Sequence, residues 1–147
     1  MHLYAGKMIS RKPASLLCSL FCLFPLRALA TLSRSQYCFE SCNAVLYSVP
    51  LKGGFDACSS KLFIESGYFC AAVYCSTNEI TSYLQSTNET CRKEGYSLPS
   101  FESIVTANTD LDSIERVSEK DATRTSINHP VIPEPEYHAL GRRTVVG

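Results

Sequence analysis

The chain of 147 residues carries 14 basic and 14 acidic side chains, so its formal net charge is zero. Four of the basic residues and no acidic residue fall within the first 30 positions, which leaves ten basic against 14 acidic residues in the remainder, a net charge of −4. A mildly acidic chain lacks the positive surface that nucleic acid requires. We therefore expect no nucleic-acid partner.

Residues 1–30 have the three parts of a secretory signal peptide. A basic start that includes Lys7 is followed by an apolar run over residues 14–24, and Ala28-Leu29-Ala30 is the small-x-small pattern that signal peptidase cleaves. A membrane-spanning helix is the alternative, but it needs about 20 apolar residues and this run is about half as long. We expect cleavage after Ala30, which also removes two of the eight cysteines.

The other six cysteines lie within one 54-residue window, and no cysteine follows it. Such a stretch behind a secretory leader is typical of a disulfide framework, which holds together a domain too small to be stable by burial alone. A zinc cluster is the alternative, but disulfides prevail in secreted chains, so we assign no metal ligand. The six cysteines are Cys38, Cys42, Cys58, Cys70, Cys75 and Cys91.

After the leader, the composition divides the chain into two regions. Residues 31–96 hold the six cysteines and nearly all the aromatic residues, so we expect a cysteine-rich extracellular domain there. Residues 97–147 are rich in Ser, Thr, Asp, Glu and Pro and poor in large apolar side chains. We expect this second region to be a largely disordered stalk, with at most a weak helix over residues 110–121.

The spacing of apolar residues in the first region predicts a mostly α fold of three or four short helices. Over residues 37–49 the apolar positions follow the i, i+4, i+7 series of one helix face, and Pro50 ends it. A short second helix is expected over residues 55–63. The sequence Glu65-Ser66-Gly67 then breaks the helical pattern.

The next segment, residues 68–75, is apolar all round, so its pattern allows either a buried strand or a buried helix. Two alanines within it favour a helix. A further helical stripe runs from Ile80 to Cys91, with a cap at Thr77-Asn78 and an end at Gly95.

Six cysteines allow many connectivities, and sequence alone does not choose among them. Cys38 and Cys42 are one helical turn apart, so both should bridge to another segment rather than to each other. Cys70 and Cys75 have a similar spacing. If the two segments run antiparallel, the nested pairing Cys38–Cys75 and Cys42–Cys70 fits, and Cys58–Cys91 is left over.

The residues that carry enzyme chemistry are few. The two histidines after the leader, His129 and His138, lie in the region expected to be a stalk, so we expect both to be solvated. The chain has no Cys-x-x-Cys redox pair and no glycine-rich phosphate loop, and its carboxylates are scattered. We therefore assign no catalytic residue, no cofactor and no metal. Asn88-Glu89-Thr90 is the single glycosylation sequon, which predicts a glycoprotein if Asn88 faces solvent.

The segments around the cysteines resemble the extracytoplasmic N-terminal region of fungal ferric-chelate reductases, membrane enzymes related to NADPH oxidases. The element Cys-Ala-Ala-x-Tyr-Cys at residues 70–75 is the more specific part of this resemblance, and the tail is less specific. Residues 136–145 also look like the stretch that, in this family, leads into the first membrane helix. The other matching segments are residues 38–44, 68–76 and 98–101, with Cys58 and Cys91 between them.

The resemblance implies an electron-transfer system, in which electrons pass from cytosolic NADPH through FAD and two haems to extracellular ferric chelates. The sequence offers no membrane helix with haem-ligating histidines and no flavin or nucleotide domain, so no catalytic residue can be carried over and haem, FAD and NADPH are expected only in a full-length relative. We expect an extracellular cap or interaction module, on the outer face of the plasma membrane and truncated before the membrane part. Its expected partners are the remainder of the reductase and ferric chelates.

Two other functions remain open. The chain could be a free-standing secreted cysteine-rich protein, such as an effector or surface protein. It could also be a haem- or metal-binding secreted module similar to the fungal eight-cysteine surface domains, although six cysteines argue against this. Arg142-Arg143 is either a dibasic processing site or the charged flank of a membrane helix, and the resemblance favours the flank.

Overall fold

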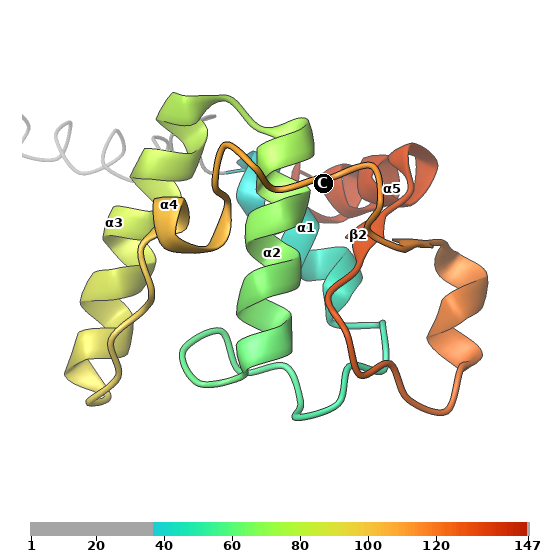
Figure 1. Cartoon of the computed structure of the whole chain (residues 1–147), viewed down its shortest axis with the longest axis horizontal. Helices are drawn as coiled ribbons and strands as arrows, with labels where there is room; N and C mark the ends of the chain where they lie inside the picture. Colours follow the sequence, from blue (N-terminus) through green and yellow to red (C-terminus); the bar gives the residue numbers. More distant parts are fainter. Residues whose placement is uncertain (1–36, 147) are drawn as a thin grey trace, which may run out of the picture. The chain divides into compact units, whose positions relative to one another are not determined.

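The computed structural model describes residues 37–146, and the signal peptide expected at residues 1–30 lies outside them. The described part holds five α-helices, a 3-10 helix and two strands of two residues each. Figure 1 shows α1 and α2 side by side at the centre, with α3 and α5 on opposite sides of them. The prediction of a mostly α fold with disulfides is therefore confirmed.

Helix α1 (Tyr37–Leu46) confirms the helix predicted over residues 37–49, but it ends earlier. Its last turn is tightened by a bond of the 3-10 type, in which the Val49 N–H donates to the Leu46 carbonyl at 3.1 Å. Pro50 follows directly, where it cannot continue a helix. Seven of its ten residues are buried, and the two cysteines among them bridge to α2.

Helix α2 (Lys61–Tyr74) is one long helix where the sequence predicted two shorter segments. The helix expected over residues 55–63 is wrong for most of its length, because residues 57–59 form a turn and the helix begins at Lys61. The apolar stretch that allowed either a strand or a helix is helical up to Tyr74.

The predicted break at Glu65-Ser66-Gly67 is also wrong, because these residues lie within α2 and serve its packing. A Cβ atom at Gly67 would lie 3.3 Å from the Asn43 Oδ1 atom and 3.5 Å from the ring of Phe39, so glycine lets α1 and α2 approach closely. Buried Ser66 accepts a hydrogen bond through Oγ from the Val131 N–H at 3.1 Å. Both small residues therefore mark contacts, not a helix end.

Helix α3 (Thr77–Lys93) confirms the predicted helical stripe and ends before Gly95 as expected, but its cap is Ser76 and not the predicted Thr77-Asn78. Its start is fixed by the Glu79 carboxylate, which accepts hydrogen bonds at 2.8 Å from the N–H and from the hydroxyl of Ser76. Its end is followed by Gly95, whose φ of +87° suits glycine. The short helix α4 (Phe101–Ile104) comes next.

Three disulfides join these helices, with Cα–Cα separations of 5.6, 5.9 and 5.3 Å, all within the ordinary range. Two of them link α1 to α2 in nested order, which requires the two helices to run antiparallel. The third links the loop before α2 to α3. The pairs are the ones that the antiparallel arrangement predicts: Cys38–Cys75, Cys42–Cys70 and Cys58–Cys91.

The prediction of a largely disordered stalk over residues 97–147 is wrong. This region forms one compact unit with the cysteine-rich region, and it contributes β1 (Arg116–Val117), the 3-10 helix η1 (Glu119–Thr123), β2 (Ile132–Pro133) and α5 (Pro135–Val146). Strands β1 and β2 pair in parallel, with Arg116 opposite Ile132. The weak helix expected over residues 110–121 is replaced by turns, β1 and the start of η1.

The tail folds because several of its few apolar side chains enter the core that α1 and α2 begin. Val117, Ile127 and Val131 are at most 1% exposed and pack in one cluster with Leu46 and Phe63. The backbone adds to this contact, since the Ile127 N–H donates a hydrogen bond to the Pro50 carbonyl at 2.8 Å. A handful of well-placed apolar residues is therefore enough to order the region.

Helix α5 packs closely on α1. A Cβ atom at Gly141 would lie 2.5 Å from the Ser41 carbonyl oxygen and 2.9 Å from the Val45 side chain, so no larger residue fits without movement. The Tyr137 hydroxyl lies 2.5 Å from the Ser48 hydroxyl and 3.4 Å from the Val45 carbonyl. The helix is thus held by both shape and hydrogen bonds.

Candidate functional site

His138 on α5 is the one histidine in the core of the described residues. It is 5% exposed, and the prediction that it is solvated is therefore wrong. Its ring stacks on the ring of Tyr74 from α2, with centroids 4.3 Å apart and planes at 9°. The helix that carries it is docked by its neighbours Tyr137 and Gly141, so the sequence around the histidine positions the ring.

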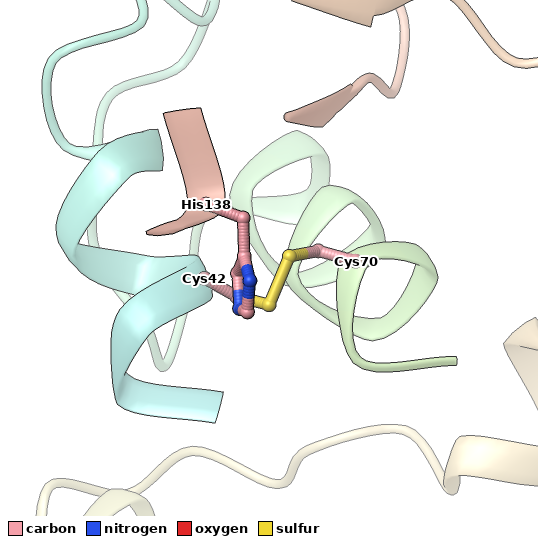
Figure 2. A group of neighbouring side chains, drawn as sticks. All are labelled: Cys42, Cys70 and His138. Carbon is pink, nitrogen blue, oxygen red and sulfur yellow. A yellow bond between two sulfur atoms is a disulfide. The ribbon is translucent and has the colours of Figure 1, made fainter. Parts of the chain in front are cut away.

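The imidazole lies against the Cys42–Cys70 disulfide, as Figure 2 shows. A ring nitrogen and the two sulfur atoms all lie within 4.8 Å of one another. The ring has a backbone hydrogen bond with Cys38 on α1, whereas its Nε2 atom is buried and has no partner among the described residues. A buried polar atom left without a partner is unusual and needs an explanation.

These three side chains have the donor types of a metal site, but the disulfide removes two of the donors. Cysteine binds a metal ion as a thiolate, and both sulfur atoms here share a covalent bond with each other. The cluster in this state therefore offers a single imidazole nitrogen inside a closed interior.

Burial lowers the pKa of the His138 imidazole below its ordinary value of 6.5, because a charge in the interior loses its hydration. The hydrogen bond with the Cys38 backbone acts in the opposite direction, and the positive charge of Arg142 adds to the lowering. The ring is therefore held neutral at neutral pH. A neutral ring leaves one nitrogen with a free lone pair, which is the partnerless Nε2.

Tyr74 connects this histidine to the strands. Its hydroxyl donates a hydrogen bond to the Pro133 carbonyl in β2 at 2.7 Å. Burial raises the pKa of this phenol, while the nearby Arg116 lowers it. The stack of His138 on Tyr74 therefore joins α5, α2 and β2 at one point.

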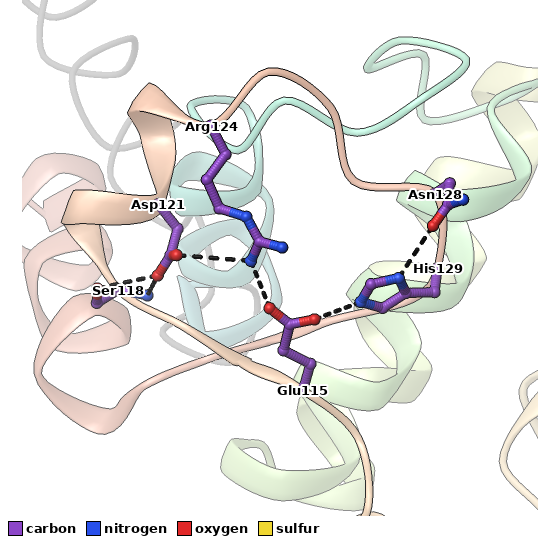
Figure 3. A network of polar contacts seen from close by, with 6 residues as sticks. All are labelled: Glu115, Ser118, Asp121, Arg124, Asn128 and His129. Carbon is purple, nitrogen blue, oxygen red and sulfur yellow. Dashed lines mark hydrogen bonds and ion pairs between the residues drawn. The ribbon is translucent and has the colours of Figure 1, made fainter.

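A second polar cluster lies on the surface of the tail (Figure 3). The Glu115 carboxylate bonds to the Arg124 guanidinium through one oxygen and to the His129 ring through the other. Hydrogen bonds from Arg124 and then from His129 lower the pKa of Glu115. Asp121 lies 3.5 Å from Arg124 and accepts hydrogen bonds from Ser118, which lower its own pKa.

This surface network fixes the loop between β1 and β2, and its residues are exposed or half-buried. A surface hollow of about 560 Å³ lies beside it, lined in part by Phe69, Asp110, Glu115 and His129. A hollow of this size can hold a small ligand. The Glu115 carboxylate, however, is already engaged by a cation and a ring nitrogen, so it does not offer a free acidic ligand.

The remaining residues singled out in the sequence are placed as follows. Five of the six cysteines are buried or partly buried within the helical packing, and Cys58 is partly buried at the turn before α2. Asn88 is exposed on α3, so the sequon faces solvent as a glycan requires. Arg142 and Arg143 are exposed on α5. Within residues 37–146, the acidic residues do not gather into a group that could hold a metal ion.

No protein family, no curated protein and no solved structure matches this chain. Between residues 37 and 146, no helix combines the length and the apolar character that crossing a membrane requires. The three disulfides are compatible with an extracellular or secreted protein, because disulfides persist in oxidising compartments.

Proposed function

We propose that this chain is an extracellular cap or interaction module of a ferric reductase-like membrane oxidoreductase that serves iron reduction and uptake. In this proposal the module is not catalytic by itself. The observation that supports it is the convergence of the segments that carry the resemblance. Residues 38–44, 68–76 and 136–145 lie in or beside α1, α2 and α5, and these three helices pack on one another around two disulfides and His138.

In this proposal, the packing of α5 lets the module fix the orientation of the segment that follows it. In the family that the sequence resembles, the stretch equivalent to α5 leads into the first membrane helix. Because α5 is clamped to α1 at Gly141 and Tyr137, a segment joined to its end would be held in a fixed orientation to the disulfide-linked core. The module would then sit at a set position over the outer face of the membrane part, near the point where ferric chelates are reduced.

The exposed side of α5 supplies a contact surface for this role. Leu140 and Val146 are 41% and 63% exposed, and Arg143 lies between them at the same three-residue spacing. Residues three apart lie near one another on a helix surface. Apolar residues beside an arginine suit contact with the membrane part of a reductase or with lipid headgroups.

The chemistry of the two polar clusters supports a non-catalytic role. His138 is enclosed and neutral, and Glu115 is bound by Arg124 and His129. Neither cluster therefore presents a free base or an accessible set of metal ligands to a substrate.

The experiment that tests the proposal combines sequencing of the transcript with a measurement of ferric reduction by intact cells. The transcript is sequenced past the codon for Gly147, and the locus is deleted in the source organism. Reduction of an external ferric chelate is then followed with a chromogenic Fe(II) chelator. We expect an in-frame continuation into membrane spans with paired histidines, and a loss of surface ferric reduction that the intact locus restores.

Variants of the contact surface sharpen this test. Replacing Leu140 and Val146 together by Asp should lower the restored reduction rate, whereas Val73→Asp on α2, which is 36% exposed, should leave it unchanged. A stop codon directly after Gly147 in the mature message, together with unchanged ferric reduction in the deletion strain, would contradict the proposal.

A free-standing secreted cysteine-rich protein is the second candidate. It is favoured by the compact core, in which three disulfides and the docked α5 enclose the buried apolar side chains of α1, α2 and the tail. This candidate predicts the intact protein in the culture medium.

A further inference from the structure

The three disulfides leave half of the domain without a covalent tie. All of them lie between Cys38 and Cys91, so the region from residue 97 to residue 146 is held by packing and hydrogen bonds alone. His138 lies at the centre of that packing, between α5 and the α1–α2 pair. The docking of α5 therefore depends on whether this ring is in a charge state that the interior can accommodate.

The surroundings of the ring accept a neutral imidazole and not a cation. The Cys38 backbone faces it from α1, and Tyr74 and the Cys42–Cys70 disulfide face it from α2. The charged group that acts on it among the described residues is Arg142, one turn along α5, and its charge is positive. The Nε2 atom has no hydrogen-bond partner in the part of the chain that the structure describes. The charged groups around Tyr74, which act on the phenol and not on the imidazole, are Arg116, Glu134 and Glu136.

We propose that His138 makes the docking of α5 sensitive to acid: a proton on its partnerless ring nitrogen releases α5 from α1 and α2, while the disulfides keep α1, α2 and α3 together. A second proton would place an unpaired cation in the interior, which is costly. Release returns the ring to water, where the cation is solvated. This inference stands independently of the proposed function.

The direction with pH follows from linkage. The docked ring has a pKa below 6.5, and the released ring has the ordinary value near 6.5, so the released state binds more protons. The docked state is therefore fully favoured above about pH 6.5, and the docking equilibrium falls by up to about tenfold per pH unit below it until the docked ring also titrates.

Three acidic groups of the domain titrate below this range. Asp56, Glu115 and Asp121 all have a pKa below their ordinary values of 3.8 or 4.5, so their interactions are lost only at lower pH. Burial raises the pKa of Glu40 on α1 above its ordinary value of 4.5, so the His138→Gln variant, and not the pH range alone, assigns a response between about pH 5 and 6.5 to His138.

Release of α5 has two local consequences that can be observed. It uncovers the Cys42–Cys70 disulfide, whose two residues are fully buried in the docked state. It also frees the backbone of Arg142-Arg143, which lies within the helix when α5 is docked. An acidic compartment would thus expose both a reducible bond and a dibasic sequence.

The test uses the oxidised full chain and measures hydrogen exchange of backbone amides by mass spectrometry at about pH 7.5 and about pH 5, after correction for intrinsic exchange rates. We expect the amides of α5 to lose about tenfold or more of their protection between the two pH values, and the amides of α1 and α2 to change little. The ring of His138, followed by NMR, should titrate over the same interval.

Two variants make the test specific. His138→Gln keeps a polar donor for the Cys38 carbonyl but does not titrate, so the protection of α5 should become the same at both pH values. His129→Gln is the matched control, because His129 is exposed in the surface network, and it should retain the acid response of the wild-type chain.

Three results would overturn the proposal: equal protection of α5 at both pH values in the wild-type chain, an acid response that persists in His138→Gln, or a His138 ring that titrates at or above 6.5. If His138→Gln fails to dock α5 at neutral pH, the wild-type NMR titration still decides, since the ring and the α5 amides must change together.

Discussion

The two halves of this domain are stabilised in different ways. Residues 37–96 are joined by three disulfides, two of which fasten α1 to α2 at successive helical turns. Residues 97–146 have no cross-link and are held by a few buried apolar residues, a close contact at Gly141 and a stacked histidine. Stability within one compact unit is thus unequal, and the tail is the part that can detach while the rest remains folded.

The largest effect on stability is expected from removing a disulfide of the first half. Replacing Cys42 and Cys70 by Ala should lower the free energy of unfolding by about 2–4 kcal/mol, because the unfolded chain regains freedom and both positions are fully buried. The denaturant midpoint of the whole domain measures this loss. The matched control replaces Cys58 and Cys91, which lie farther from α5. Amide exchange of α5 is compared in the two double variants. An equal loss of α5 protection in both would show that the Cys42–Cys70 bond has no particular role in the docking of α5.

The second-largest effect is expected from Gly141→Ala. The added Cβ atom would lie 2.5 Å from the Ser41 carbonyl oxygen, so α5 must move away from α1 at a cost of about 1–3 kcal/mol. Amide exchange should show the loss in α5 but not in α3. Ala139→Val, which adds bulk at an exposed position of the same helix, is the control. Unchanged protection of α5 in Gly141→Ala would mean that the helices are not in close contact.

A smaller effect is expected at Tyr68, which lies within the first half and packs on the start of the second. Its hydroxyl donates to the Pro99 carbonyl at 2.9 Å, and burial raises the pKa of Tyr68 to about 12. Tyr68→Phe should cost about 1 kcal/mol. Because the folded phenol resists ionisation, its stabilisation is complete below pH 10 and is lost between about pH 10 and 12.

An ultraviolet titration of the tyrosines checks this prediction. The last phase of phenolate formation should be absent from Tyr68→Phe and present in Tyr96→Phe, since Tyr96 is 44% exposed. If Tyr68 ionises together with the exposed tyrosines, the contact between α2 and the segment after α3 is not maintained in solution.

The smallest effect is expected from Glu115→Gln. This residue bonds to Arg124 and His129 at the surface, where solvent screens the charges, so the denaturant midpoint should stay within the error of measurement. Local exchange in the loop between β1 and β2 should nevertheless rise. A marked fall in global stability would show that the surface network, and not the buried histidine, holds the tail.

The parts of the fold that local rules control could be predicted from the sequence. Apolar spacing located α1 and α3, and the spacing of Cys38, Cys42, Cys70 and Cys75 favoured the nested pairing if the helices run antiparallel. Gly67 misled the prediction, because a glycine that lets two helices approach looks the same in sequence as a glycine that ends one.

The order of the tail could not be predicted in this way. Val117, Ile127 and Val131 have no common period, and the surface that buries them exists only after α1 and α2 have joined. The burial of His138 was missed for the same reason. A signal was present in its neighbours, since Tyr137 and Gly141 are one turn apart and mark a face of close helix contact.

The measurement that tests the central claim most directly is a proton NMR experiment on His138 in the oxidised chain at neutral pH. The claim is that the tail is docked on the disulfide-linked core through this ring. It predicts nuclear Overhauser effects between the ring protons of His138 and Tyr74, whose centroids are 4.3 Å apart, and a ring pKa below 6.5. Sharp His138 signals with no contact to Tyr74 and an ordinary ring pKa would contradict it, and would restore the detached stalk that the composition suggests.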